Sequence, residues 1–535
     1  MRVLLLCDGG GPMGAGHVIR SLALAEAALA ADHDVVVAGH FEGSFVHSQL
    51  AAAPVEVHEL LTPLADGDLS QVRDLVRRMG PEVLHIDSYG APLGIGELVA
   101  FGPGAGLRNT LSNMEDGPFG RRPADVVIDP TFGGEHSPRP DDGSTWLLRG
   151  SRYTPVRQRV VDARQRSDDG VAAVDLSAAE HAAARSVLVV MGGTDPMGLA
   201  PVAVELLVRT GLPLDVTVIA VGENADLVVA AALGSRLSLS ILKPVDDLAA
   251  IMARQDLVIS AAGTTVWELC CIGEPMAVVW VVENQREGYE RVVAAGAALG
   301  LGGPELRGEL STGECEGAVS LLTTALTESR VRVDLIRAGR DIVDGLGAWR
   351  VVRTWEQAQR LGSSARPGSS RKGSPRQLTA RPVHMQDARL LWEWRNNAGT
   401  RASSRNSGLI PWAQHLAWLE TSLSREEQRL LLFEDEMGLV GTVRWDLVHE
   451  GEWEVSITVA PDRRGQSLAR PLLREAEAAL SHGATSSLAD VTAYLAVVNV
   501  ENGASLRLFE SSAYLPDLPP DAGGFMRFRK PAPVA

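Results

Sequence analysis

The sequence lacks any apolar run that could cross a membrane. A spanning helix needs about 20 consecutive apolar residues, and the chain of 535 residues has no such run, although 45% of its residues are hydrophobic. The short apolar segment from Val3 to Cys7 leads straight into a glycine-rich stretch, so we expect a buried strand there and not a signal peptide. A chain of this length is expected to form about three or four domains.

Cysteine is scarce as well. The four cysteines are Cys7, Cys270, Cys271 and Cys315; two are adjacent, and their spacing matches no metal site. This pattern disfavours a disulfide framework, so we expect a protein of the reducing cytoplasm that uses no metal. The formal net charge of −17 argues against a broad face for nucleic acid. Small anionic substrates in a local basic pocket fit this charge, and composition does not specify an oligomeric state.

Upstream of residue 360, apolar runs of strand type alternate with Ala- and Leu-rich helical stretches. This alternation predicts parallel sheets covered by helices. The strands fall into two groups separated near residues 147–160, so we expect two Rossmann-like domains facing each other across a cleft, with ligands at the carboxyl ends of the strands. The expected strands are Val3 to Cys7, Val35 to Ala38, Val83 to Ile86, Val126 to Ile128, Val187 to Met191, Val216 to Val221, Leu257 to Ser260 and Ala277 to Val281.

A segment of different composition follows these domains. Residues 361–377 are rich in Ser, Gly, Pro and basic residues, which is typical of a flexible linker. We therefore expect two Rossmann-like domains at 1–155 and 156–360, the linker, and one α+β domain at 378–535.

A glycine-rich loop follows the first expected strand and contains a histidine. Gly14 and Gly16 precede His17, and Arg20 follows in the next helix. Glycines let backbone amides approach an anion or a sugar closely, and the helix amino terminus adds partial positive charge. An imidazole in the first helical turn, at the mouth of the cleft, is placed to act as a base near neutral pH. A solvent-facing or helix-capping histidine fits that position equally well.

This loop resembles that of UDP-2,4-diacetamido-2,4,6-trideoxy-β-L-altropyranose hydrolases, the pseudaminic-acid pathway enzymes, which have a GT-B fold. Further segments resemble the same family in the same order: Asp87 to Tyr89 after a strand, Gly192 to Asp195 after another, and a third from Ser260 to Gln285. The resemblance implies UDP-sugar binding by Gly14, Gly16, Arg20, Tyr89, Gly192, Gly193, Thr194, Asp195, Gly263, Thr264, Thr265, Glu268, Asn284 and Gln285.

The implied reaction is hydrolysis at the anomeric carbon, with His17 as general base. Asp87 would orient the imidazole or hold a sugar hydroxyl, or it would simply cap the turn after its strand. Glu268 suits a ribose diol, because a carboxylate can accept two hydrogen bonds. A glycosyltransferase that uses an amino-sugar nucleotide as donor is the main alternative, since the same fold serves both reactions.

The region downstream of the linker resembles the GNAT acetyltransferase superfamily, particularly members that acetylate UDP-linked amino sugars. The segments Leu391 to Asn397 and Trp412 to Trp418 resemble that subgroup, although tryptophans at helical spacing are more often core residues. A strand at Glu454 to Ala460 leads into a loop that resembles the superfamily's pyrophosphate loop. The acetyl-CoA-binding residues implied are Val459, Arg464, Gly465, Ser467, Leu468, Ala469, Asn502 and Ser505.

The acetyltransferase region departs from its family pattern at several positions. Ser467 stands where Gly or Ala is usual, Asp462 where Arg or Gln is usual, and Phe509 where many members have a Tyr as general acid. Phenylalanine cannot donate a proton, so water or Tyr514 is expected to serve instead. Glu454 is the expected base for the amine. A domain that has lost catalysis and only binds is the alternative.

The two regions together predict a bifunctional enzyme of fold class α/β: two Rossmann-like domains (GT-B-like), then an α+β GNAT domain. It would hydrolyse a UDP-linked 2,4-diacetamido-trideoxy sugar and acetylate the amino-sugar precursor, with acetyl-CoA as co-substrate.

Overall fold

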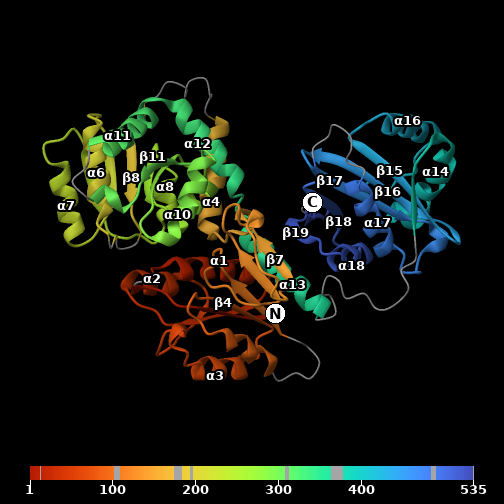
Figure 1. Cartoon of the computed structure of the whole chain (residues 1–535), viewed down its shortest axis with the longest axis horizontal. Coiled ribbons are helices and arrows are strands. Elements are labelled where there is room, and N and C mark those ends of the chain that lie inside the picture. Colours follow the sequence, from red (N-terminus) through yellow and green to blue (C-terminus); the bar gives the residue numbers. More distant parts are fainter. Residues whose placement is uncertain are drawn as a thin grey trace. The chain divides into compact units, whose positions relative to one another are not determined.

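The computed structural model describes residues 1–11, 14–101, 109–173, 183–192, 195, 197–307, 312–362, 378–482 and 490–533. The chain forms two compact units, Met1–Gln359 and Arg360–Ala535 (Figure 1). The expected linker lies almost entirely outside the described residues. No described helix is long and apolar enough to cross a membrane.

The first unit contains two parallel sheets, and the amino-terminal lobe is built on the first of them. Its strand order is β3-β2-β1-β4-β5-β6-β7, and every neighbouring pair is parallel. Because helices cover such a sheet, its central strands read as continuous apolar runs, as Val3 to Cys7 does. The elements are β1 (Arg2–Cys7), α1 (Gly16–Ala30), β2 (Asp34–Gly39), α2 (Ser44–Ala52), β3 (Glu56–Glu59), α3 (Ser70–Met79), β4 (Val83–Asp87), β5 (Thr110–Met114), β6 (Val126–Asp129) and β7 (Trp146–Arg149).

The second lobe of this unit repeats the design. Its sheet has the order β10-β9-β8-β11-β12-β13, again parallel throughout. The strands are β8 (Ser186–Val190), β9 (Asp215–Ile219), β10 (Ser238–Leu242), β11 (Leu257–Ala261), β12 (Met276–Val279) and β13 (Leu299–Gly302), and the helices are α4 (Gln158–Ala173), α6 (Leu199–Arg209), α7 (Glu223–Ala232), α8 (Leu248–Met252), α9 (Thr264–Ile272), α10 (Glu283–Ala294), α11 (Thr312–Thr327) and α12 (Ser329–Ile342).

The last helix of the unit, α13 (Gly347–Leu361), contacts the amino-terminal lobe, whereas the sequence analysis assigned it to the second lobe. Residues 156–360 were assigned to the second lobe, but the fully buried Trp355 donates from Nε1 to Ser112 Oγ over 2.9 Å. Gln359 Nε2 donates to Thr110 Oγ1 over 2.8 Å. These contacts are with β5 of the amino-terminal lobe, so the chain returns to its first sheet before leaving the unit.

The second unit is one mixed sheet with helices. Its strand order is β14-β15-β16-β17-β18-β20-β19, in which β17 and β18 are parallel and the other pairs are antiparallel. The elements are β14 (Thr379–Pro382), α14 (Ala388–Asn396), α15 (Ala398–Ala402), α16 (Trp412–Leu423), β15 (Gln428–Asp435), β16 (Gly438–His449), β17 (Glu452–Val459), α17 (Ala469–His482), β18 (Ala493–Asn499), α18 (Gly503–Ser511), β19 (Leu515–Leu518) and β20 (Phe525–Pro531).

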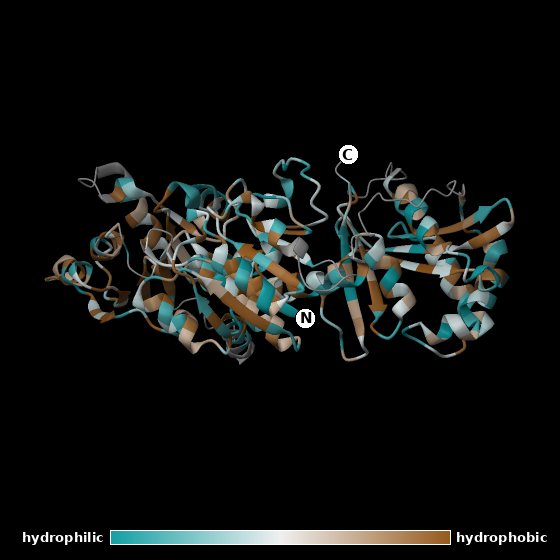
Figure 2. Ribbon diagram, turned by 90° about the horizontal axis from the view of Figure 1, so that it is seen from below, coloured by the Kyte–Doolittle hydropathy of each residue, from teal (hydrophilic) through white to brown (hydrophobic). Residues whose placement is uncertain are grey.

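The predicted fold class is confirmed: two parallel Rossmann-like sheets are followed by an α+β domain. Hydrophobic stretches run along several of the strands, and the helices alternate between hydrophobic and hydrophilic residues (Figure 2). Several strands that sequence analysis did not predict, such as β3 and β10, carry polar or exposed residues. In β5, for example, Ser112 is fully buried and accepts from Trp355, so its polar character reflects a tertiary contact.

Candidate functional site

His17 lies in the first turn of α1, where the glycine loop after β1 ends. Its side chain is buried, with 6% of the residue exposed. Nδ1 lies 3.0 Å from the main-chain oxygen of Asp87, at the end of β4. A carbonyl can only accept, so the neutral imidazole carries its proton on Nδ1 and keeps the Nε2 lone pair free. The geometry therefore orients Nε2 as the basic atom.

A charged network surrounds this imidazole. Arg20 binds both carboxylate oxygens of Asp87, each over 2.6 Å, and its third nitrogen donates to Asp116 over 2.8 Å. Tyr89 donates to Asp116 as well, and its ring packs edge-on against His17 at 4.5 Å. Burial alone would raise the pKa of Asp87, but the charge and hydrogen bonds of Arg20, with further contributions from His17 and His85, together outweigh burial and the pKa is lowered. Asp87 is therefore ionised, and it orients His17 through its backbone while its carboxylate fixes Arg20.

The loop after β11 in the second lobe faces the histidine loop. A Cβ added to Gly16 would lie 3.4 Å from Cγ2 of Thr264, the first residue of α9. A Cβ on Gly263 would lie 3.4 Å from Nε2 of Gln285. The glycines thus let three predicted segments meet, one from the first lobe and two from the second.

Glu268 and Asn284 complete the predicted nucleotide region in the second lobe. Glu268 lies one turn into α9 and is half-buried, and its side chain makes no hydrogen bond with any other described residue. Burial raises its pKa to about 7, although Arg159 and Arg157 act in the opposite direction. Asn284 is exposed at the start of α10, and Thr265 is half-buried beside Thr264. A carboxyl group without a protein donor is available to a ligand.

The loop after β8 is only partly described. Gly193 and Thr194 lie outside the described residues, whereas Gly192 is exposed with φ 80°. Gly14, in the first lobe, is also exposed, with φ 68°. Asp195 is buried, and its carboxylate accepts from the N–H groups of Leu199 and Ala200, over 2.9 and 2.8 Å. The carboxylate of Asp195 thus caps α6, which differs from the ligand contact expected of it.

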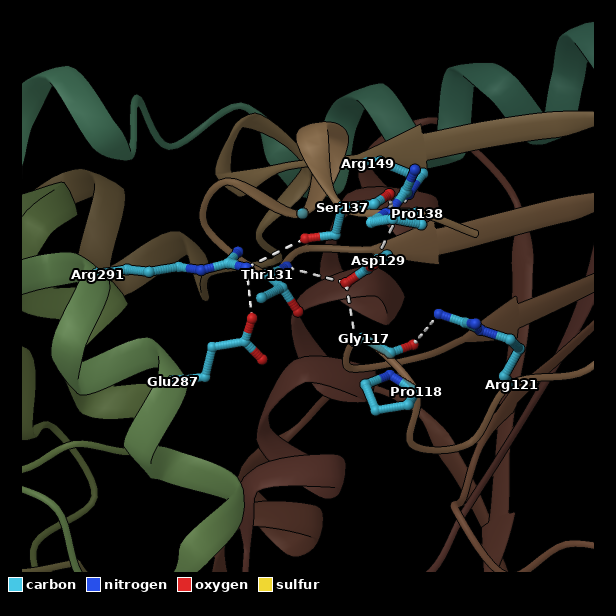
Figure 3. A pocket seen from close by; sticks show the side chains of 11 residues that line it. Gly117, Pro118, Arg121, Asp129, Thr131, Ser137, Pro138, Arg149, Glu287 and Arg291 are labelled. Carbon is cyan, nitrogen blue, oxygen red and sulfur yellow. Dashed lines mark hydrogen bonds and ion pairs between the residues drawn. The ribbon is translucent and has the colours of Figure 1, made fainter. Parts of the chain in front are cut away.

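A polar pocket lies between the two lobes, further along the same edge of the first sheet (Figure 3). Residues after β5, β6 and β7 form one side, and α10 of the second lobe forms the other. Arg291 of α10 donates to Phe132 O and, over 3.1 Å, to Ser137 Oγ of the first lobe. The lining residues are Gly117, Pro118, Arg121, Asp129, Thr131, Gly134, Ser137, Pro138, Arg149, Glu287 and Arg291. Sequence analysis did not find this pocket, although Asp129, like Asp87, ends a strand.

In the second unit, the predicted pyrophosphate loop joins β17 to α17. Gly465 and Ser467 have φ values of 78° and 58°. Within the described residues, no backbone N–H from 464 to 468 donates a hydrogen bond inside the chain. Free amides at a helix amino terminus suit an anion. The positive φ of Ser467 explains why glycine is favoured at this position.

Other residues position this loop. Val459 ends β17 and is half-buried, Leu468 is buried, and Ala469 begins α17. The Arg464 side chain turns away toward α15 and donates to Asn397 and Thr400, over 3.0 and 2.6 Å. Sequence analysis also missed Arg463, which pairs with Asp435 at 2.7 Å.

Glu454 is a half-buried carboxyl on β17, opposite Asp446 of β16. Burial raises its pKa, with Arg405 acting in the opposite direction and Asp446 reinforcing the rise. Arg405 has no carboxylate or hydrogen-bond partner among the described residues, and its guanidinium lies over the Phe525 ring at 5.3 Å. Sequence analysis did not identify Arg405, because it lies in the loop after α15, far from Glu454 in the chain, and only the fold brings its charge within range of that carboxyl group.

The carboxyl-terminal segment is mainly structural. Asn502 caps α18 by accepting from the Ser505 N–H over 3.1 Å. Phe509 is buried and packs against Tyr514 at 5.0 Å. Tyr514 is fully buried and donates to Glu477 over 2.9 Å. Its hydroxyl thus belongs to the core, which differs from the proton donor expected.

The two tryptophan segments divide between core and surface. Trp394 is 8% exposed, whereas Trp412 and Trp418 are 36% and 37% exposed. Arg444 lies over the Trp418 ring at 5.8 Å and pairs with Asp446 at 2.8 Å. The Trp418 indole is therefore in contact, through Arg444, with the strand that faces Glu454. Among the described residues, no group of three or more His, Cys, Asp or Glu is arranged to hold a metal ion.

Comparison with known proteins shows which family of domains the second unit matches. The acetyltransferase (GNAT) family model matches residues 390–513, so the carboxyl-terminal domain is a GNAT acetyltransferase domain. A solved structure of spermidine N-acetyltransferase from Vibrio cholerae, in complex with CoA and spermine, is 19% identical, with a TM-score of 0.27; it covers 29% of this chain and 96% of its own.

Larger parts of the chain resemble other proteins. Spore coat polysaccharide biosynthesis protein SpsG of Bacillus subtilis is 24% identical over 366 residues, 66% of this chain and 97% of its own. An uncharacterized protein of Methanocaldococcus jannaschii, MJ1062, is 22% identical over 299 residues, 54% of this chain; the match spans only 58% of that protein. The structure of Acinetobacter baumannii MurG covers 66% of this chain and 99% of its own at 16% identity, with a TM-score of 0.47.

Proposed function

We propose that the chain is a bifunctional enzyme of nucleotide-sugar metabolism. The first unit would hydrolyse a UDP-linked 2,4-diacetamido-trideoxy sugar, and the second would transfer an acetyl group from acetyl-CoA to the amino-sugar precursor. The observation that carries the hydrolase proposal is the oriented imidazole of His17 opposite the loop of Gly263 and Thr264. The similarity to a spore coat polysaccharide biosynthesis protein supports a carbohydrate substrate.

In the hydrolytic step, Nε2 of His17 takes a proton from water as the water oxygen bonds to the anomeric carbon. The bond from that carbon to the diphosphate oxygen breaks, and UDP leaves with the electron pair. A positioned base of this kind contributes about 10² to 10⁴ in rate. Amides of the loops at Gly14, Gly192 and Gly263 would stabilise the charge that develops on the diphosphate.

Glu268 would accept the ribose hydroxyls, since it is the carboxyl of this region that no protein donor satisfies. Gln285 would donate from Nε2, because its Oε1 already accepts from the Val281 N–H over 2.9 Å. Arg20 and Asp87 bind each other, so their role would be to hold the histidine loop against β4.

In the acetyl transfer step, free amides of residues 464–468 would hold the pyrophosphate of CoA. Glu454 would accept the proton of the amine as its nitrogen bonds to the acetyl carbon, and the thiolate leaves. Arg405, whose charge acts on Glu454 without forming an ion pair with it, would bind the anionic part of a nucleotide-linked amine. A guanidinium whose charge reaches the base also disfavours a polycation as acceptor.

The test is to incubate the full chain with UDP-2,4-diacetamido-2,4,6-trideoxy-β-L-altropyranose and follow UDP and free sugar by NMR. We expect release of both, reduced about 10² to 10⁴ fold in His17→Ala but retained in His47→Ala, an exposed histidine of α2. UDP binding without turnover would contradict the hydrolase and favour a glycosyltransferase.

The acetyltransferase is tested separately with acetyl-CoA and the UDP-linked 4-amino sugar. Transfer should be seen with this acceptor, and Arg405→Gln should raise its KM about tenfold, with the KM of acetyl-CoA unchanged. Equal turnover of spermidine and the sugar nucleotide would contradict the anionic acceptor. CoA binding without transfer to any amine would favour a binding-only domain.

A further inference from the structure

Gln49 is a buried glutamine of α2 in the amino-terminal lobe, and both ends of its side-chain amide bind residues of the second lobe. Its Oε1 accepts from Nη2 of Arg159 in α4 over 2.8 Å, and its Nε2 donates to Asp246 Oδ1 over 3.1 Å. Only 1% of the residue is exposed. Buried polar groups are normally satisfied, and the amide has no other partner among the described residues. Gln49 is therefore satisfied only while the two lobes are in contact.

The two partners also fix the orientation of this amide. A guanidinium can only donate, and an ionised carboxylate can only accept. Turning the Gln49 amide over would place its NH₂ group against Arg159 and its oxygen against Asp246, and both contacts would then be repulsive. Arg159 donates from Nη1 to the main-chain oxygen of Asp246 as well. Gln49, Arg159 and Asp246 thus form a closed ring of hydrogen bonds between the lobes, which we call the interlobe clasp.

On the side of the second lobe, the clasp is linked to the proposed nucleotide region. Both hydrogen-bond partners of Arg159 are uncharged oxygens, and no carboxylate among the described residues forms an ion pair with it. Its charge acts on Glu268, where it is the largest influence that opposes the effect of burial on the pKa. The guanidinium therefore holds Gln49 and Asp246 through its donors, while its charge favours the ionised form of the carboxyl group proposed for the ribose.

On the side of the first lobe, the clasp is linked to the histidine loop. Helix α2 begins shortly after Glu42, whose N–H donates to Gly9 O over 2.8 Å. The main-chain oxygen of Glu42 lies so close to Gly10 that an added Cβ would be only 2.0 Å away. Because these backbones are in close contact, a shift of α2 also shifts the glycine loop that leads to His17.

A second contact between the lobes lies at the start of α1. There a Cβ on Gly16 would lie 3.4 Å from Cγ2 of Thr264, which is an ordinary van der Waals approach. Such a contact has no preferred direction, whereas hydrogen bonds define both a distance and an angle. The clasp is therefore the better candidate for setting how the histidine loop lies against the loops of the second lobe.

We propose that Gln49, Arg159 and Asp246 are positioning residues for the hydrolysis, and that the clasp sets the place of His17 relative to the sugar nucleotide. The inference rests on the proposed hydrolase. The three residues act through the histidine loop and take no part in the chemistry. Because the ribose carboxyl and two of the proposed phosphate loops belong to the second lobe, loosening the clasp should lower kcat more than the affinity for UDP.

The test exchanges donor and acceptor across the lobes. Gln49→Glu removes the amide donor and sets two carboxylates against each other, so kcat for UDP release should fall about tenfold. Asp246→Asn alone should stay within about twofold of the wild type, because its amide oxygen still accepts from Gln49. In the double variant, Gln49→Glu with Asp246→Asn, the amide at 246 donates to the carboxylate at 49. We expect kcat to return to within about twofold of the wild type.

Three quantities are measured for each full-length variant: kcat and KM for UDP release from the UDP-linked 2,4-diacetamido-trideoxy sugar, the Kd of UDP by calorimetry, and the melting temperature. Gln71→Glu is the matched control. It makes the same change of charge on the exposed surface of α3, where Oε1 accepts from the Leu61 N–H over 2.9 Å, and it should keep the wild-type kcat. For Gln49→Glu, we expect the Kd of UDP to stay within about threefold of the wild type while kcat falls.

Two further variants sharpen the assignment. Ser48→Ala removes a hydroxyl that lies 2.9 Å from Asp246 Oδ1, and this milder change should lower kcat about threefold. It keeps the test decisive if Gln49→Glu is too unstable to assay. Arg159→Gln also removes the charge that acts on Glu268, so it should lower kcat and weaken UDP binding together.

Wild-type kcat in Gln49→Glu, or a loss of kcat that Asp246→Asn fails to recover, would overturn the inference and leave the hydrolase standing. An equal loss of kcat and UDP affinity in Gln49→Glu would overturn it too, because it would show a role in folding alone. Absence of UDP release from the wild type would overturn the hydrolase and this inference together.

Discussion

The two candidate bases differ in how the protein prepares them. His17 is buried in a network in which Arg20 neutralises Asp87 and Asp116 before any substrate arrives. Glu454 is half-buried and has no direct hydrogen-bond partner among the described residues. Preorganised charge lowers the cost of reorganisation during the reaction. Removing a member of the first network should therefore affect folding, whereas removing the second base should affect only chemistry.

The largest effect is expected at Glu454. Glu454→Gln keeps the shape of the side chain but cannot accept a proton, so kcat for acetyl transfer should fall about 10² to 10⁴ fold. The melting temperature should stay within about one degree, because no hydrogen bond or ion pair is lost. Steady-state kinetics and thermal unfolding measure the two quantities, and a large loss of stability would contradict the comparison.

The second effect concerns Arg20. Arg20→Met leaves the buried carboxylate of Asp87 without its partner, and breaking a buried pair costs about 3–5 kcal/mol. We expect this loss in the free energy of unfolding measured by urea denaturation. Arg77→Gln, which alters an exposed pair, should change it by less than about 1 kcal/mol. A similarly small change for both variants would show that the network is not preorganised.

A smaller effect is expected from pH. Burial raises the pKa of Glu268 to about 7, so the carboxyl is mostly protonated at pH 6 and mostly ionised at pH 8. Because ribose hydroxyls donate best to the ionised form, UDP affinity should rise about tenfold across this interval. UDP affinity is measured by calorimetry for the wild type and for Glu268→Gln. The pH dependence that remains in the variant is the part that comes from the phosphates of UDP. An identical pH dependence in the variant would exclude the ribose role.

The smallest effect is expected at Ser467. Its φ of 58° costs a non-glycine residue about 1 kcal/mol, so Ser467→Gly should raise the free energy of unfolding by up to about 1 kcal/mol. Ser467→Ala keeps the strained backbone and should be as stable as the wild type. Urea denaturation distinguishes the two, and equal stabilities in all three proteins would contradict the argument.

Much of the architecture could be predicted because buried parallel strands leave a strong pattern. The strands β1, β8 and β11 are covered on both faces, so each appears in the sequence as an almost continuous hydrophobic segment, and β4 does so apart from His85 and Asp87. Strand β5 does not appear in the sequence as a hydrophobic segment, because it contains polar residues such as Ser112. Ser112 is buried because it accepts a hydrogen bond from Trp355 of α13. The position of α13 itself followed from no local signal.

Candidate site residues could be predicted from the sequence only where they come directly after a strand or a glycine-rich turn. His17, Asp87 and Gly263 stand at such points, and the structure brings the loops of the two lobes together there. Asp195 stands at a similar point, yet its carboxylate binds the end of a helix. Tyr514, which follows α18, donates to Glu477 in the core. A motif gives the residue type and its place in the chain, but not the partner of its polar atoms.

The sequence by itself determined the order of the domains, the sheets and the loops that carry the chemistry, because these depend on local periodicity and on glycine. Only the tertiary structure decided which side chains meet. Asp129 and Arg149 end β6 and β7, whereas Arg121 lies in the loop after β5. The charge of Arg405, in the loop after α15, acts on Glu454 of β17. Hydrogen-bond satisfaction depends on every neighbour within about 3.5 Å, and those neighbours come from distant parts of the chain.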